Sequence, residues 1–349
     1  MSLHHITDVA GLHRHLQAAV QLEHATIPPY LTALYSIRPG TNSDACLVLR
    51  AVAVEEMLHL TLAANILNAV GGSPDLTAPG FVPAFPAYLP DGETDFEVGL
   101  RRFSTEAIDT FLKIERPAPA DGESIRTVER PPKATMLGAG KVADDGEEHF
   151  YSIGEFYRAI EDGLIRLEAE HGGALFSGDP SRQITPEFYY SGGGEIIPVT
   201  DLASARAAIR LIAEQGEGDG GAIFDYEDEI AHYYRFEQLQ LGRYYRPGDV
   251  PGRPSGGAVE VDWGAVYPIK TNARVADYPE GSELRRAAEA FNREYGAFLG
   301  RLTRAFRGEP ALLNDAMGDM FRLKDLAGQL MRQPLDGTGS EHAAPTFEV

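Results

Sequence analysis

The chain has 349 residues, with 31 Lys and Arg against 52 Asp and Glu, and a formal net charge of -21. The length allows one large domain or two ordinary ones, and 43% hydrophobic with 24% charged residues is typical of a folded soluble protein. The acidic surface would repel nucleic acid and anionic membranes, so we expect neither as a partner. The single Cys46 excludes an internal disulfide and any Cys-x-x-Cys motif.

No targeting or membrane segment is visible in the sequence. The first 20 residues lack the cationic start, apolar stretch and cleavage site of a signal peptide. The most apolar stretch, residues 47–70, is interrupted by charged and polar side chains and is not expected to span a bilayer. We therefore expect a cytoplasmic protein.

Helical periodicity predicts two long helices at the start of the chain, over about residues 8–37 and 43–70. Pro28 and Pro29 should kink or interrupt the first helix, because neither ring nitrogen donates a hydrogen bond. The following region, residues 74–150, is rich in Pro, Gly and short apolar runs. This composition predicts an insertion of loops with a few short strands.

More helices are expected after this insertion, over about residues 152–170, 201–215, 224–243, 282–307 and 310–332. The glycines within residues 188–200 predict a strand pair, and residues 246–281 are expected to be irregular. We predict a mainly α protein in two parts. Residues 1–245 form a four-helix bundle with its insertion, and residues 246–349 supply an irregular segment and C-terminal helices that pack on the bundle.

Acidic side chains fall on the apolar faces of the first two predicted helices. Glu23 lies near the centre of an apolar stripe in the first helix, and Glu56 and His59 lie within the stripe of the second. The spacing Glu-x-x-His projects both side chains from adjacent turns of one helix face. Because a buried ionised carboxylate is costly unless it is paired or binds a metal, this pattern predicts a metal site.

The same spacing recurs late in the chain, at Glu229 and His232. One such motif arises by chance, and a lone Glu23 would most simply be a carboxylate paired to Lys or Arg. Two motifs on apolar faces with a further buried Glu match a dinuclear site in a four-helix bundle, which takes two single Glu and two Glu-x-x-His. Carboxylates and imidazoles without thiolates suit iron or manganese, so we expect two transition-metal ions, iron foremost.

The second single Glu of this ligand set has three possible positions. Glu155 stands near the start of its predicted helix, and Glu214 stands at the end of another. Glu168 forms a third Glu-x-x-His with His171.

The expected symmetry of the helical hairpins favours Glu214. The midpoint between Glu23 and Glu56 falls on the turn of the first hairpin, and the midpoint between Glu214 and Glu229 falls beside a glycine pair. However, Glu214 lies off its apolar stripe and could pair with Arg210 on the surface. Glu214 and Glu155 therefore both stay open as the sixth ligand.

Several long motifs resemble the ferritin-like domain of the iminophenyl-pyruvate dimer synthase family, which is found in bisindole pathways such as those of violacein and rebeccamycin. The motifs are QLEHATIPPYLTALYSI (21–37), EEMLHLTLAANILNAVGG (55–72), YLP (88–90), IGEFYRAIEDG (153–163), IAEQGEGD (212–219) and HYYRFEQL (232–239). The similarity covers roughly residues 8–245. It implies a ferritin-like bundle and a link to oxidative specialised metabolism. By this resemblance the metal ligands are Glu23, Glu56, His59, Glu229 and His232, and the positions of Glu155, Glu214 and Glu217 match as well.

These features together predict a non-haem di-iron, or iron–manganese, oxidase or oxygenase that uses O2 on a small organic substrate. Its cavity would be walled by Tyr30, Tyr226, Tyr233 and Phe236. The alternatives are a ferroxidase or storage-type protein with the same ligands and no organic substrate, and a non-catalytic scaffold. The long irregular insertions favour an enclosed substrate cavity. A homo-oligomer is compatible with each of these hypotheses.

Overall fold

The computed structural model describes residues 6–90, 96–117, 127–128, 149–150, 152–189, 192–218, 221–225, 228–335 and 339–349. Within these ranges the chain is mostly helical, as predicted, and its one sheet is a short antiparallel pair, β1 (Thr127–Val128) and β2 (His149–Phe150). Residues 91–95, 118–126 and 129–148 of the predicted insertion lie outside the description. None of the described helices is long and apolar enough to cross a membrane.

A long helical hairpin, α1 (Val9–Ser36) and α2 (Ser43–Ala69), forms the centre of the fold. Asp8 caps α1 by accepting a hydrogen bond from the Gly11 N–H at 2.6 Å. The helix continues through Pro28 and Pro29 without the interruption that the sequence suggested. Both prolines are buried, so packing of α1 along α2 outweighs the loss of two backbone donors.

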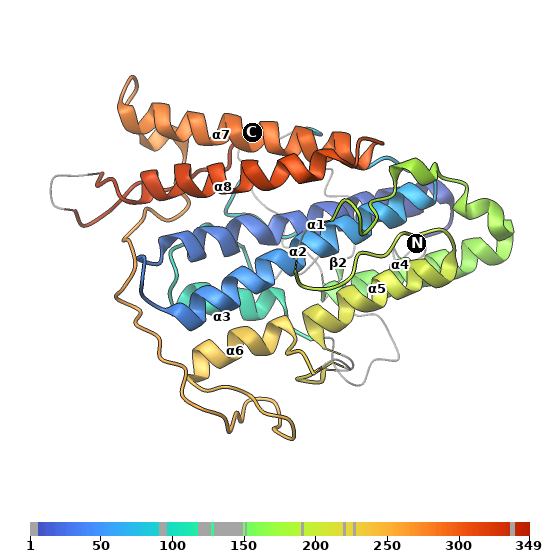
Figure 1. Ribbon diagram of the computed structural model, residues 1–349, viewed down its shortest axis with the longest axis horizontal. Helices are drawn as coiled ribbons and strands as arrows, with labels where there is room; N and C mark the ends of the chain where they lie inside the picture. Colours follow the sequence, from blue (N-terminus) through green and yellow to red (C-terminus); the bar gives the residue numbers. More distant parts are fainter. Residues whose placement is uncertain are drawn as a thin grey trace.

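The other helices cover the hairpin from two sides (Figure 1). On one side, α7 and α8 pack against each other and against α1 and α2. On the other side, the pair α4 and α5 covers one half of the hairpin, and the pair α3 and α6 covers the other half. The bounds are α3 Thr105–Ile114, α4 Ile153–His171, α5 Leu202–Glu217, α6 His232–Leu241, α7 Glu283–Phe306 and α8 Leu312–Met331, with short 3-10 helices at η1 Gly172–Phe176, η2 Pro180–Arg182 and η4 Val275–Asp277.

Three further local predictions differ from the structure. Helix α3 lies in the region predicted as loops and short strands, capped by Ser104, which accepts from the Ala107 N–H. The described residues of 188–200 form no strand. Helix α6 begins at His232 and not near residue 224.

The late start of α6 has a local cause. The backbone N–H of Glu229 donates to the Asp225 carboxylate at 2.9 Å, and the Asp225 N–H donates to the Glu229 carbonyl at 2.9 Å. Asp228 between them adopts a left-handed φ of 62°. These bonds make a turn, and Asp and Asn tolerate that conformation better than other non-glycine residues, so the turn competes with helix before residue 232.

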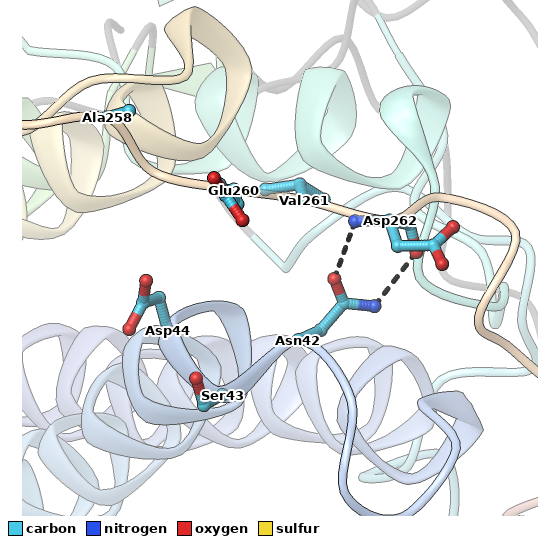
Figure 2. Close-up of a pocket in the computed structure, with 7 residues that line it drawn as sticks. All are labelled: Asn42, Ser43, Asp44, Ala258, Glu260, Val261 and Asp262. Carbon is cyan, nitrogen blue, oxygen red and sulfur yellow. Dashed lines mark hydrogen bonds between the residues drawn. The ribbon is translucent and has the colours of Figure 1, made fainter.

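The irregular segment after α6 is tied to the turn between α1 and α2. The Asn42 side-chain amide donates to the Asp262 carbonyl at 2.9 Å and accepts from the Asp262 N–H at 2.8 Å (Figure 2). One hydrophobic core contains residues on both sides of position 245, for example Leu12 and Leu330. The division of the chain at residue 245 stays a prediction.

Candidate metal centre

Five buried acidic and imidazole side chains converge where the pairs α3–α6 and α4–α5 meet under the central hairpin. Glu23 comes from α1, Glu56 and His59 come from α2, Glu115 directly follows α3, and His232 is the first residue of α6. Each is at most 3% exposed. They form two triads that share one carboxylate, Glu23–Glu56–His59 and Glu56–Glu115–His232, and the possible ligand atoms of each triad lie within 4.8 Å of one another.

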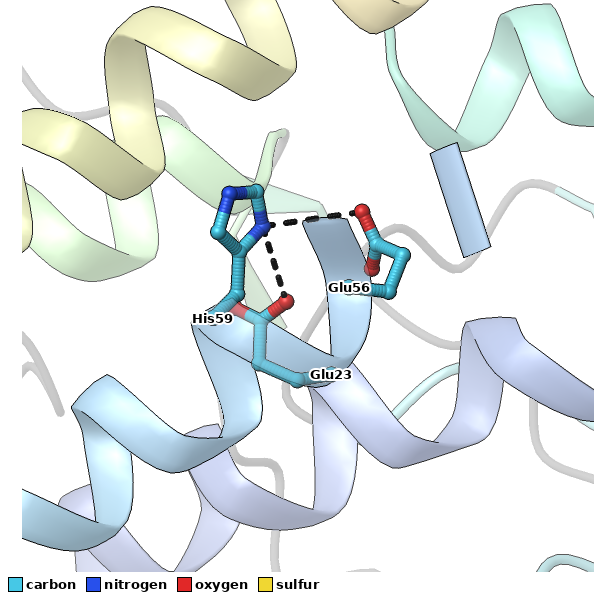
Figure 3. Close-up of side chains that lie close together, drawn as sticks. All are labelled: Glu23, Glu56 and His59. Atoms are coloured by element: carbon cyan, nitrogen blue, oxygen red, sulfur yellow. Dashed lines mark ion pairs between the residues drawn. The ribbon is translucent and has the colours of Figure 1, made fainter. Parts of the chain in front are cut away.

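The two imidazoles face the carboxylates through the same ring atom. His59 Nδ1 lies 3.6 Å from Glu23 Oε2 and 3.6 Å from Glu56 Oε1 (Figure 3). His232 Nδ1 lies 3.1 Å from Glu56 Oε1 and 3.5 Å from Glu115 Oε2. The rings stack with their centroids 5.4 Å apart. Glu56 Oε1 therefore lies between the two imidazoles.

The outer nitrogen of each imidazole has its own acceptor. His59 Nε2 bonds to Gln215 Oε1 at 2.9 Å, and His232 Nε2 bonds to Glu55 Oε2 at 2.7 Å. Arg235 in turn pairs with Glu55 Oε1 at 2.8 Å. A hydrogen bond at Nε2 fixes the tautomer that leaves Nδ1 free to bind a metal, which is the usual support of a metal-ligating His.

The three carboxylates are held in a matching way. Each accepts a hydroxyl hydrogen bond on one oxygen and turns its other oxygen to the imidazoles. The bonds run from Tyr157 to Glu23 Oε1 at 2.5 Å, from Thr26 to Glu56 Oε2 at 2.7 Å, and from Tyr30 to Glu115 Oε1. This arrangement leaves Glu23 Oε2, Glu56 Oε1 and Glu115 Oε2 as the inward donors.

Burial and the charges of neighbouring side chains shift the pKa values of this cluster. Burial raises the pKa of Glu23 to about 7. The hydrogen bond to His59 opposes this shift, and the negative charge of Glu56 adds to it. Burial and Glu56 also raise the pKa of Glu115. Burial alone would lower the pKa of His59, but Glu23 and Glu56 outweigh it and raise that pKa to about 10.

These shifts mean that protons balance the buried carboxylates when no cation is bound. A cation between the inward oxygens would replace those protons. His232 Nδ1 fits this interpretation because it is fully buried and makes no hydrogen bond of good geometry within the described ranges. The donor set of three carboxylates and two imidazoles could hold metal ions, and the residues present fit two of them.

The structure brings together Glu23, Glu56, His59 and His232 from the predicted set. It places Glu229 apart from them, with a side chain 52% exposed and 3.5 Å from the Arg235 guanidinium. The spacing Glu-x-x-His aligns side chains only on a helix, and Glu229 lies in the turn before α6.

The three positions considered for the sixth ligand also lie outside both triads. Glu214 pairs with Arg210 at 2.5 Å, which is the alternative that its position off the apolar stripe suggested. Glu155 is buried in the first turn of α4, and Glu168 lies near the other end of that helix. Of the predicted cavity walls, Tyr30 and Phe236 are buried with ring centroids 5.3 Å apart, whereas Tyr226 lies outside the described residues.

Glu115 was missed at the level of sequence, although a signal for it exists. Ile108, Phe111 and Glu115 follow the helical spacing i, i+3, i+7, so the carboxylate continues an apolar stripe as Glu23 does. The surrounding Pro and Gly led to a loop prediction for this region. Glu55, next to Glu56, was missed because a single position beside a ligand carries no periodic signal.

A small cavity adjoins the triads on the side of α4 and α5. It measures ≈ 10 Å³, which is room for about one water molecule. Four of the five converging side chains line it, all but His232. The rest of its wall consists of Ile153, Gly154 and Tyr157 from α4 and Ile212, Ala213, Gly216 and Glu217 from α5.

Glu and His side chains that project inward from packed helices to a common centre are the architecture of ferritin-like di-metal proteins. The chain belongs to the ferritin-like family, whose model matches residues 16–241. Among individual proteins it is similar to dichlorochromopyrrolate synthase from Lentzea aerocolonigenes, with 25% identity over 337 residues, covering 86% of this chain and 29% of that protein. The chain thus spans less than a third of that relative's length.

A solved structure shows the same fold. It is a ferritin-like protein from Caulobacter vibrioides, with a TM-score of 0.60, 23% identity, and 97% of both chains covered. The predicted fold class is confirmed by this match and by the family model. The predicted resemblance to the ferritin-like domain of the iminophenyl-pyruvate dimer synthases is confirmed together with it.

Proposed function

We propose that this protein is a non-haem di-metal oxidase or oxygenase that uses O2 on a small organic substrate in specialised metabolism. The observation that carries the proposal is the pair of triads sharing Glu56, each with two carboxylates and one imidazole. Burial of five ionisable groups is costly, and a bound cation pair offsets that cost.

Each triad would hold one ion. Glu23 and His59 belong to one ion, Glu115 and His232 belong to the other, and Glu56 is common to both. Oxygen and imidazole donors without thiolate suit iron, with manganese as the second choice. Two iron ions held there would supply electrons for the reduction of dioxygen.

The chain itself contributes position, orientation and exclusion of water. The hydroxyl groups of Tyr157, Thr26 and Tyr30 fix which oxygen of each carboxylate faces inward. The acceptors Gln215 and Glu55 fix the orientation of the imidazoles. Such preorganisation in a dry site keeps the donor geometry constant while the charge at its centre changes.

The small-molecule part of the proposal is supported by the relative from Lentzea aerocolonigenes, whose name describes the synthesis of dichlorochromopyrrolate. The present chain corresponds to 29% of that protein. From this relative we therefore infer a small organic molecule as the class of substrate, and not the relative's own substrate. The oxidation is inferred from the two triads.

A ferroxidase is the second function that an observation favours. The cavity beside the triads has room for about one water molecule, which suits a site that meets only iron and dioxygen. Excess Fe(II) in air separates the two functions. A ferroxidase would oxidise many equivalents of iron per chain, whereas an oxidase would stop after the iron in its own site is oxidised.

Metal loading tests the proposal directly. Metal-free protein is incubated with Fe(II) without oxygen, desalted and measured by elemental analysis, and we expect two iron ions per chain, one for each triad. Because Glu56 is common to both triads, Glu56→Ala should lose both ions. The matched control is Glu229→Ala, which removes an exposed Glu and should keep both. Loading of Glu56→Ala at the wild-type level would refute the proposed centre.

A further inference from the structure

We infer that a small exogenous ligand reaches the metal centre between the N-terminal turn of α4 and the C-terminal turn of α5, and that Gly216 keeps this side open. The inference rests on the proposed di-metal function and names the residue that controls access to it.

No member of either triad lies on one side of the centre, and the carboxylate that lines the cavity there, Glu217, accepts a hydrogen bond from the Gly154 N–H at 2.6 Å. All members of the two triads come from α1, α2, the end of α3 and the start of α6. Helix α5 contributes Gln215 behind His59, and α4 contributes Tyr157 behind Glu23. The cavity lies on this remaining side. An additional ligand therefore has space only where α4 and α5 form the wall.

Within that wall, Gly216 is the residue that faces Glu115. A methyl group at its Cβ position would lie 3.7 Å from Glu115 Oε2 and would meet no other described atom within 4 Å outside its own turn of helix. Its φ is not in the left-handed region, so the backbone gives no reason for glycine there. Glycine is also less favourable than alanine inside a helix. The lack of a side chain thus serves the space beside Glu115.

At the neighbouring position 154, glycine is required for a different reason. A Cβ atom there would lie 2.5 Å from Glu217 Oε2, and the Gly154 N–H donates to Glu217 Oε1 at 2.6 Å. Glycine at 154 therefore permits the close packing of α4 on Glu217. Gly216 has no such steric neighbour, which singles it out as the residue that sets the size of the exogenous ligand.

The cavity size defines the class of ligand. Room for about one water molecule suits dioxygen or a small anion, and a bulky group at position 216 would fill it. Azide is a suitable probe because it is small and its binding to ferric iron is visible as an absorption band. We therefore expect the azide affinity of the iron-loaded protein to fall as the side chain at position 216 becomes larger.

The experiment titrates iron-loaded, oxidised full-length protein with azide and measures iron content in parallel. Filling a packed site by several carbon atoms should weaken azide binding about tenfold or more in Gly216→Leu, and about threefold in Gly216→Ala. The matched control is Gly300→Leu in α7, where a Cβ atom would meet nothing within 4 Å. We expect wild-type azide affinity and two iron ions per chain in the control.

Wild-type azide affinity in an iron-loaded Gly216→Leu protein would overturn the inference, as would iron-loaded wild-type protein that binds no azide. If Gly216→Leu loses iron, Gly216→Ala decides in its place, and unchanged azide affinity in that variant overturns the inference. Wild-type protein that takes up no iron would refute the proposed function itself, so the two failures are distinguishable.

Discussion

Replacing Glu115 tests the residue that the structure added to the centre. Glu115 is 3% exposed, accepts a hydrogen bond from Tyr30, and lies with Oε2 3.5 Å from His232 Nδ1. Glu115→Gln keeps the shape and an acceptor for Tyr30 but removes one of the two carboxylates of the second triad. The first triad, with Glu23 and His59, is unchanged.

We expect Glu115→Gln to bind one iron ion tightly and the second at least about 100-fold more weakly, which corresponds to roughly 2.7 kcal/mol. The fold should not suffer. Burial raises the pKa of Glu115, so its ionised form destabilises the metal-free folded state above the ordinary pKa of Glu, and removing the charge relieves this. The thermal midpoint of the metal-free variant should equal or exceed that of wild type.

Anaerobic titration with Fe(II), followed by elemental analysis and a thermal melt, gives both quantities. The matched control is Glu155→Gln, another buried Glu that lies outside both triads and should leave two ions bound. Two tightly bound ions in Glu115→Gln would refute the assignment of Glu115 to the second site. Loss of one ion in Glu155→Gln would instead make Glu155 the missing carboxylate.

Three other outcomes follow from the contacts. Tyr157→Phe removes the 2.5 Å hydrogen bond to Glu23 and should weaken iron binding about tenfold without unfolding the protein, as measured by competition with a chelator. The pKa of Glu23 at about 7 means that the carboxyl is protonated below that pH, so iron affinity should fall as pH drops through 7, with proton release on binding; a pH-independent affinity contradicts this. Asn42→Ala removes two hydrogen bonds to Asp262 and puts Ala at a φ of 49°, so the free energy of unfolding should fall by about 2 kcal/mol in denaturant titrations, and by less in Asn42→Gly, which has no conformational cost there.

The local sequence was sufficient to predict the two long helices of the central hairpin and the polar side chains on their buried faces. The apolar stripes of α1 and α2 defined a long hairpin, and Glu23, Glu56 and His59 stood out because carboxylates are costly on a buried face. His232 was found by the same reasoning, although its helix is shorter than predicted. Periodicity can do this because it reports which face of a helix is buried.

Periodicity failed at the start of α6, where a local turn competes with the helix. Residues 224–231 have helical spacing, but the bonds between Asp225 and Glu229 make a turn there and carry Glu229 away from the centre. Spacing does not rank a turn against the first turn of a helix, because the first N–H groups of a helix have no partner within it and a turn with a side-chain acceptor such as Asp225 can satisfy them.

Only the tertiary structure decided which side chains meet. Glu115 and His232 are 117 positions apart and join one triad because α3 and α6 pack together under α1 and α2. The sequence determines that these groups are buried. Their contact depends on how separate helices dock, and docking is set by the fit of whole helix faces, which no single stretch of sequence contains.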